Sequence, residues 1–203
     1  MVLERLYPLD LIERHVLYAF MLGAGYAFIG IGASVLLFPE DPAIVAVAFI
    51  SLMFYPTVNS ILRQEEEIES QIEEEFRLHT FIRDHHNSFK IYSLFFLGTL
   101  LGFSFFALML PSLATNHIFE NQINVLYGAG HAGKAYFSSA LFKNILINNL
   151  NVLLLVFVAA FVFGEGGLFL IVWNASVWGT IFGNLAKTAA LSSAQNPITV
   201  FGT

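Results

Sequence analysis

Carboxylate and imidazole side chains gather in the charged stretch of residues 63–87. Glu75 and His79 are four residues apart and share one face of a helix, and His86 lies two turns further along, near that face. Carboxylate and imidazole groups suit Zn, Fe or Mn, so one interpretation is a divalent-metal site formed by these three residues. The spacing differs from the Glu-x-x-His and His-Glu-x-x-His motifs. A solvated helix without a metal explains the same residues and is the interpretation we prefer.

A second group of polar residues lies in the last hydrophobic segment, "GEGGLFLIVWNASVWGTIFGN". Glu165 sits among glycines at its start, and Asn174 lies on a face of bulky apolar residues. Buried polar groups in hydrocarbon are costly without partners. We therefore expect Asn174 to hydrogen-bond to another helix, or the helix to break there.

Three interpretations compete for this segment. The polar residues could join helices within or between subunits. They could line a cation pathway, with Glu165 as the ion ligand or proton carrier beside Asn174 and the region of Asn148. Asn174 to Ser176 also forms a glycosylation sequon, which we treat as a chance match because it lies inside an apolar segment. Packing is the interpretation that we prefer.

Residue spacing supports packing in the last two hydrophobic segments. In the final one, Ser176, Thr180 and Asn184 recur every four residues. A neighbouring stripe has small residues at the same spacing, which permits close helix approach, and consists of Ala175, Gly179 and Gly183. In the preceding segment Asn149 points away from a face that carries Asn144, Asn148 and Asn151.

The composition places these residues in a membrane protein. Of 203 residues, 57% are hydrophobic and only 12% are charged, whereas soluble domains carry about a quarter charged residues. Nine basic residues against 15 acidic ones argue against nucleic acid as a partner. The chain has no cysteine, which excludes disulfides and thiolate sites.

Hydrophobic runs of about 20 residues predict membrane-spanning helices. We expect an all-α fold with five such helices, separated by turns that contain proline or glycine, and no signal peptide before the first. The five predicted spans are 15–38, 43–62, 88–110, 143–163 and 168–186. Pro56 predicts a kink in the second span. The charged stretch is expected to continue this span into water as a helix. Residues 112–142 are predicted to be a polar-to-mixed stretch with glycine breakers. The chain thus divides into an N-terminal helix pair (1–62), an acidic helix (63–87) and a remaining membrane region (88–203).

Basic residues favour the cytoplasmic side of a membrane. Alternation of five spans puts Lys134, Lys143 and Lys187 on one side and twice as many basic residues on the other: Arg5, Arg14, Arg63, Arg77, Arg83 and Lys90. The expected arrangement is a multi-pass cell-membrane protein with a cytoplasmic N-terminus and a protruding acidic cytoplasmic helix.

Catalysis is not expected. His117 and His131 lie in the external stretch with Glu120, but no zinc signature, nucleophile motif or phosphate loop accompanies them. We predict no catalytic residue, no resident cofactor and no nucleic-acid partner. The partners we expect are the lipid bilayer, a second copy of the chain and other membrane proteins.

The segment "NNLNVLLLVFVAAFVFGEGGLFLIVWNASVWG" resembles the stage II sporulation protein M family. A second segment of this chain, "FIRDHHNSFKIYSLFFLGTLLGF", which follows the acidic helix, resembles archaeal members of the same family. The positions that match the family pattern are Asn148, Asn149, Phe163, Gly164, Gly166, Asn174 and Gly179. The resemblance runs from Arg63 to the end. It implies a polytopic helical protein without known catalysis and a further span after Thr203, so we expect either that the sequence is a fragment or that another chain supplies this helix.

The leading hypothesis is a homo-oligomeric membrane scaffold or assembly component. Two stripes are expected to seek partners: Ile68, Ile72 and Phe76 on the acidic helix, and the small-residue stripe of Ala175, Gly179 and Gly183. The alternative is a channel or transporter for small cations that uses Glu165 and Asn174. The residues assigned to packing or a pathway are Glu165, Asn148, Asn149, Asn174, Gly164 and Gly179.

Overall fold

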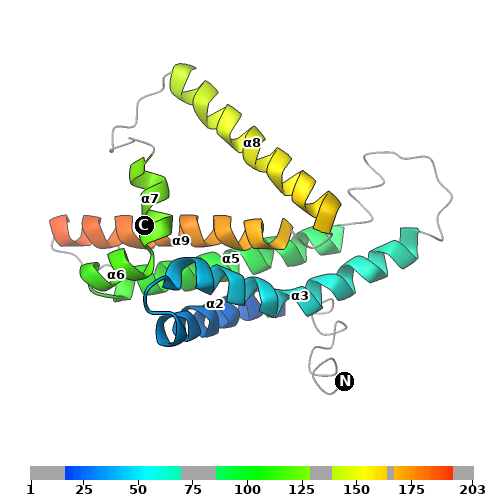
Figure 1. The fold of residues 1–203 in the computed structure, drawn as a ribbon, viewed down its shortest axis with the longest axis horizontal. Coiled ribbons are helices and arrows are strands. Elements are labelled where there is room, and N and C mark those ends of the chain that lie inside the picture. Colours follow the sequence, from blue (N-terminus) through cyan, green and yellow to red (C-terminus); the bar gives the residue numbers. More distant parts are fainter. Residues whose placement is uncertain (1–16, 70–85, 129–138, 164–166, 194–203) are drawn as a thin grey trace.

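The computed structural model of the chain describes residues 17–69, 86–128, 139–163 and 167–193, and these are almost entirely helical. The all-α fold is therefore confirmed. Five long helices are present: α2 (Leu17–Leu37), α3 (Pro42–Glu69), α5 (His86–Met109), α8 (Ser139–Phe163) and α9 (Gly167–Ser193). Two short helices, α6 (Ser112–Ile118) and α7 (Glu120–Gly128), lie between α5 and α8 (Figure 1).

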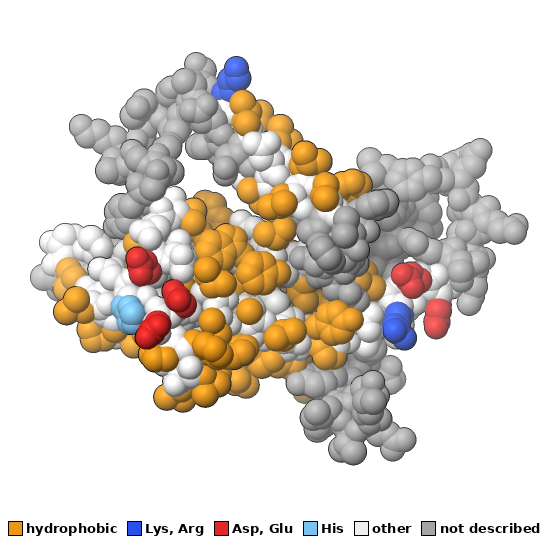
Figure 2. Space-filling model, in the orientation of Figure 1, with side chains coloured by type: hydrophobic (Ala, Val, Ile, Leu, Met, Phe, Trp, Pro, Cys, Tyr) orange, Lys and Arg blue, Asp and Glu red, His pale blue; other side chains and the backbone are white. Residues whose placement is uncertain are grey.

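Four of the described helices, α2, α3, α5 and α9, are long and apolar enough to cross a membrane. This confirms a multi-pass membrane protein. The segment α8 is a 25-residue helix at the place where the fourth span was predicted, although it is not one of those four. Figure 2 shows hydrophobic side chains spread over the bundle, with charged side chains near its ends.

The core of the fold is α5, which packs extensively against α2 on one side and α9 on the other. The helices α2 and α5 run in the same direction, because Gly23 approaches Gly98 and, one turn later in both helices, Ala27 approaches Gly102. The helix α9 also runs in this direction, because Gly179 approaches Leu100 and Gly183, one turn later, approaches Ser104. The intervening helix α3 runs antiparallel to α2 (Figure 1).

Glycine creates the contact between α2 and α5. A Cβ atom added at Gly23 would lie 2.6 Å from the carbonyl oxygen of Phe95, and one added at Gly98 would overlap the carbonyl oxygen of Phe20. Any larger residue would push the two backbones apart, since buried Cβ atoms do not approach backbone oxygen so closely. Small residues are used in this way where membrane helices pack backbone to backbone.

Aromatic rings fill the space between α2, α3 and α5. Phe54 of α3 stacks edge-on with Tyr26 of α2 at 5.1 Å between ring centroids, and it contacts Phe95 of α5 at 4.5 Å. All three rings are buried. Such pairs contribute about 0.5–1.5 kcal/mol beyond their buried area, so this contact helps to fix α3 against the other two helices.

The continuity of α3 partly tests the prediction for the acidic helix. It passes through Pro56 without a break and continues to Glu69, so the second span does extend into the charged stretch. Residues 70–85, which include Ile72, Phe76, Glu75 and His79, lie outside the described residues.

The mixed stretch predicted between the third and fourth spans begins with two helices that were not predicted, and the second of them ends at a glycine, Gly128. Phe119 donates its N–H to the carbonyl oxygen of Thr115, and Ile123 donates to that of Phe119. The helical ladder therefore crosses the junction between α6 and α7. Thr115, Ile118, Phe119, Gln122 and Ile123 are buried, so this α6–α7 segment packs on the bundle.

Candidate functional site

The polar residues of α9, for which packing and a pathway are the two interpretations, form the candidate site. Ser176 and Thr180 are fully buried. The hydroxyl of Ser176 donates to the carbonyl oxygen of Trp173 in its own helix. Ser176 also accepts a hydrogen bond from Gln122 of α7, with 3.3 Å between Nε2 and Oγ. The stripe thus faces the α6–α7 segment.

Gln122 is the polar residue that joins three helices. Its side chain is fully buried, and its Nε2 donates to the carbonyl oxygen of Ala43 at the start of α3 as well as to Ser176. Its Oε1 has no hydrogen-bond partner among the described residues, and neither has the hydroxyl of Thr180. An unsatisfied buried polar group costs about 1–3 kcal/mol, so this cluster is a local weakness within a tight contact.

The small-residue stripe of α9 is covered by α5 of the same chain. A Cβ added at Gly179 would lie 2.8 Å from Cβ of Phe103, and one added at Gly183 would lie 2.8 Å from Cβ of Ala107. The hydroxyl of Ser104 donates to the carbonyl oxygen of Gly179 at 2.9 Å. The expectation that this stripe seeks a partner subunit was therefore wrong, because α5 occupies it.

Asn174 meets neither of the two expectations for it. The helix α9 runs unbroken past it, and its half-buried amide donates to the carbonyl oxygen of Leu170 at 2.8 Å, one turn back in the same helix. An amide that bonds the i−4 carbonyl satisfies its donor locally. Spacing alone could not reveal this, since it shows which face a residue occupies but not its rotamer.

Lys187 forms a second polar contact near the far end of α9. Its ammonium group donates to the carbonyl oxygen of Leu110, just after α5, and lies 3.3 Å both from the carbonyl oxygen of Ala107 and from Oγ1 of Thr115. The last carbonyls of a helix lack intrahelical partners and carry partial negative charge. Lys187 thus caps α5 from another helix.

A third polar contact lies on the outside of the same end. Nε2 of His117, in α6, is 2.8 Å from the carbonyl oxygen of Pro39, in the turn between α2 and α3. Glu40 and Asp41 belong to the same turn, and Glu120 is the first residue of α7. Figure 2 shows acidic side chains beside a histidine on this face. No group of three potential metal ligands occurs among the described residues.

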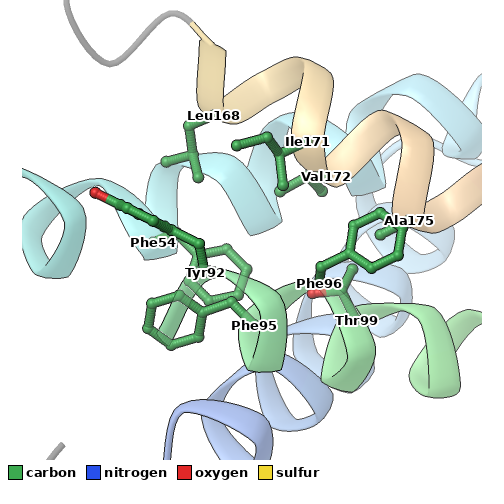
Figure 3. A pocket seen from close by; sticks show the side chains of 9 residues that line it. All are labelled: Phe54, Tyr92, Phe95, Phe96, Thr99, Leu168, Ile171, Val172 and Ala175. Carbon is green, nitrogen blue, oxygen red and sulfur yellow. The ribbon is translucent and has the colours of Figure 1, made fainter. Parts of the chain in front are cut away.

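A small, partly open cavity lies between α3, α5 and α9 in the described part of the chain (Figure 3). Its lining is formed by Phe54, Tyr92, Phe95, Phe96, Thr99, Leu168, Ile171, Val172 and Ala175. Its volume is about 10 Å³, which is at the lower limit for a single water. The cavity is therefore a packing gap, far too small for an organic substrate.

The structure brings few of the predicted site residues together. Gly179 is in the α5 contact, Asn174 bonds within α9, and Asn149 is exposed on α8. His86 is exposed at the first turn of α5. Asn148 lies in α8, but its side chain is not among those that the structure describes. The remaining predicted residues fall outside the described residues: Glu75, His79, Gly164 and Glu165.

Sequence reasoning missed Gln122, Thr115 and Lys187. A signal for the first two was present: Thr115, Ile118, Phe119, Gln122 and Ile123 repeat with helical spacing, as a face that packs on a core does. Lys187 carried no such signal, because a lysine near a helix end suggests the membrane boundary. Comparisons of the chain with protein-family models, curated proteins and solved structures gave no match.

Proposed function

We propose that the chain is a non-catalytic scaffold or assembly component of the cell membrane, with its N-terminus in the cytoplasm. The observation that carries this proposal is the use of the polar groups of α9. Ser176 bonds Gln122, Ser104 bonds Gly179, and Lys187 bonds the end of α5. Each of these contacts joins two helices rather than lining an open path.

The close glycine contacts support the same proposal. Gly98, Gly102 and Gly179 allow the backbones of α2, α5 and α9 to pack against one another. Close packing of this kind favours a rigid body over helices that slide past one another during transport. The resemblance to the stage II sporulation protein M family is part of this proposal as a polytopic helical protein without known catalysis, and the role of the family's namesake is not carried over to this chain.

The alternative drawn from the sequence is a cation pathway through Glu165 and Asn174. The amide donor of Asn174 is occupied by Leu170, and no observation on the described residues favours this alternative. It nevertheless supplies the sharpest test, because a carboxylate that carries ions or protons cannot be replaced by an amide without loss of flux.

The test is an ion-flux assay on the full chain in liposomes loaded with a K⁺-, Na⁺- or proton-sensitive dye. We expect flux no greater than in protein-free liposomes, and the same result for Glu165→Gln. Flux that is present in the unmodified protein and abolished by Glu165→Gln would overturn the scaffold proposal in favour of the pathway. Glu66→Gln, which makes the same carboxylate-to-amide change at an exposed residue of α3, serves as the matched control.

A further inference from the structure

A groove runs along the outer face of the hairpin that α2 and α3 form. Its volume is about 340 Å³. Ile29, Leu37 and Leu52 are 59%, 66% and 68% exposed, so the groove opens away from the bundle and towards lipid. We call it the α2–α3 groove, and its lining is entirely apolar: Ile29, Gly30, Ala33, Leu37, Phe49, Leu52 and Met53.

The dimensions of the α2–α3 groove match one acyl chain. Ile29 and Leu37 are eight residues apart in α2, which is about 12 Å at the rise of a helix. Half of the hydrocarbon core of a bilayer measures about 15 Å. A helix is about 10–12 Å wide, so a helix of another chain could insert only single side chains into the groove.

The outer end of the groove meets the turn between α2 and α3. The ring of Phe38, just after α2, packs on the ring of Phe49 in the groove, with 5.9 Å between their centroids. Glu40 and Asp41 follow in the turn, and both are exposed. The groove therefore leads from the apolar part of the hairpin directly to two carboxylates.

The α6–α7 segment brings a third carboxylate to this end. Nε2 of His117 is 2.8 Å from the carbonyl oxygen of Pro39, next to Glu40, which holds α6 against the turn. Glu120 is exposed and lies about one turn after His117. Figure 2 shows acidic side chains grouped here beside hydrophobic ones. We define Glu40, Asp41 and Glu120 as the acidic rim.

The acidic rim has no neighbouring cation on the elements that form it. Neither the turn at residues 38–41 nor the α6–α7 segment contains a lysine or an arginine. The one basic group on these elements is the imidazole of His117. A surface of this kind repels an anionic headgroup and attracts a cationic one.

We propose that the α2–α3 groove binds one acyl chain of a phospholipid whose headgroup ends in a primary ammonium, and that the acidic rim binds this ammonium. A primary ammonium donates up to three hydrogen bonds, and carboxylates are strong acceptors for them. A trimethylammonium headgroup has the same charge but no N–H donor. The proposal goes beyond the scaffold function and does not depend on it.

Both parts of the site are needed to choose this occupant. An unfilled apolar gap loses the dispersion contacts of its lining, and water finds no polar partner there, so hydrocarbon has to fill the groove. The acidic rim then selects the headgroup. A fatty acid or an anionic phospholipid would fill the groove equally well but would bring a negative charge to three carboxylates.

The headgroup is tested by native mass spectrometry of the full chain with phospholipids that share the same acyl chains. We expect one ethanolamine lipid per chain, retained about three- to tenfold more than a choline or a glycerol lipid, as a few exposed ion pairs provide. Glu40→Gln plus Asp41→Asn should remove this preference. Glu66→Gln plus Glu67→Gln, which neutralises exposed carboxylates near the other end of α3, should retain it.

The groove is tested by filling it. Ala33→Phe should weaken retention of the ethanolamine lipid at least about tenfold, because several methylene groups lose their contact. Leu36→Phe is the matched control, since Leu36 is 82% exposed and does not line the groove. Thermal unfolding of both variants shows whether Ala33→Phe still folds.

A measurement on the unmodified protein does not depend on any variant. In liposomes, an ethanolamine lipid with a photoreactive acyl chain should label Leu37 more strongly than Leu36, its neighbour at the same depth. Lipid that merely surrounds the protein would label Leu36 at least as strongly, because Leu36 is the more exposed of the two, 82% against 66%.

Several results would overturn the proposal. Equal retention of the three headgroups, or a preference for the glycerol lipid, would reject the acidic rim as an ammonium site. Stronger labelling of Leu36 than of Leu37, or full retention in a folded Ala33→Phe variant, would reject the groove. None of these results bears on the scaffold function, which the ion-flux assay tests separately.

Discussion

The ammonium group of Lys187 on α9 donates a hydrogen bond to the carbonyl oxygen of Leu110 at the end of α5. The two residues are 77 positions apart in the chain. They join the last described helix to the central helix of the fold, and the hydroxyl of Thr115 in α6 lies at the same point.

Lys187→Met is expected to lower the free energy of unfolding by about 1 kcal/mol, because three acceptors around the end of α5 lose a charged donor. Thermal unfolding in detergent would measure the change. Lys143→Met, which alters an exposed lysine at the start of α8, should have no measurable effect. Equal stability of the two variants would show that the cap contributes nothing.

Gly98→Ala is expected to destabilise the protein by about 1–3 kcal/mol, because the new methyl group overlaps backbone atoms of α2. The control is Gly25→Ala in α2, where an added Cβ meets nothing within 4 Å. That variant should be neutral or slightly more stable, since alanine favours a helix. The prediction fails if both variants unfold at the same temperature.

Gln122→Ala should cost about 2–4 kcal/mol, since it removes two hydrogen bonds and leaves a space among α3, α7 and α9. Asn124→Ala on the exposed side of α7 is the matched control. A double-mutant cycle with Ser176→Ala would isolate the contact between the two side chains. We expect a coupling of about 0.6 kcal/mol; a coupling of zero would mean that the 3.3 Å contact contributes no stability.

The proposed orientation predicts which ends of the helices react with a membrane-impermeant thiol reagent. Leu113→Cys, at an 87% exposed position in α6, should be labelled from outside intact cells. His86→Cys, at the opposite end of α5, should react only after the membrane is opened. Reversed labelling would place the N-terminus outside, and labelling of both from outside would contradict a spanning α5.

The solvated interpretation of the acidic helix predicts no stoichiometric metal. Elemental analysis of the purified full chain should find the same low Zn and Mn content in the unmodified protein and in the variant His79→Ala plus His86→Ala. One equivalent of metal that is lost in the double variant would establish the metal site instead. Glu66→Gln plus Glu67→Gln, which alters described carboxylates of α3, controls for nonspecific binding.

The membrane helices were largely predictable because hydrophobic runs end at prolines. Pro39 and Pro42 bound the turn between α2 and α3, and Pro111 follows α5. The α6–α7 segment was not predicted, because Thr115 and Gln122 make it polar. Their burial depends on partners far along the chain, such as Lys187 and Ser176, which local periodicity cannot specify.

The packing contacts of the candidate site were only half predictable. The spacing of Ala175, Gly179 and Gly183 identified a contact face on α9, but a face does not name its partner. That partner is α5 of the same chain. The amide of Asn174 is a further case, since the choice between an i−4 carbonyl and another helix depends on its surroundings.

The distance in sequence between α5 and α9 sets an order of events during synthesis. The groove of α5 that receives Gly179 and Gly183, and the carbonyls that receive Lys187, are made before α6, α7 and α8. Until α9 emerges, the newly made α5 exposes that face and its uncapped end to lipid or to the insertion machinery. Synthesis of α9 is thus the step that covers this face of α5 and caps its end.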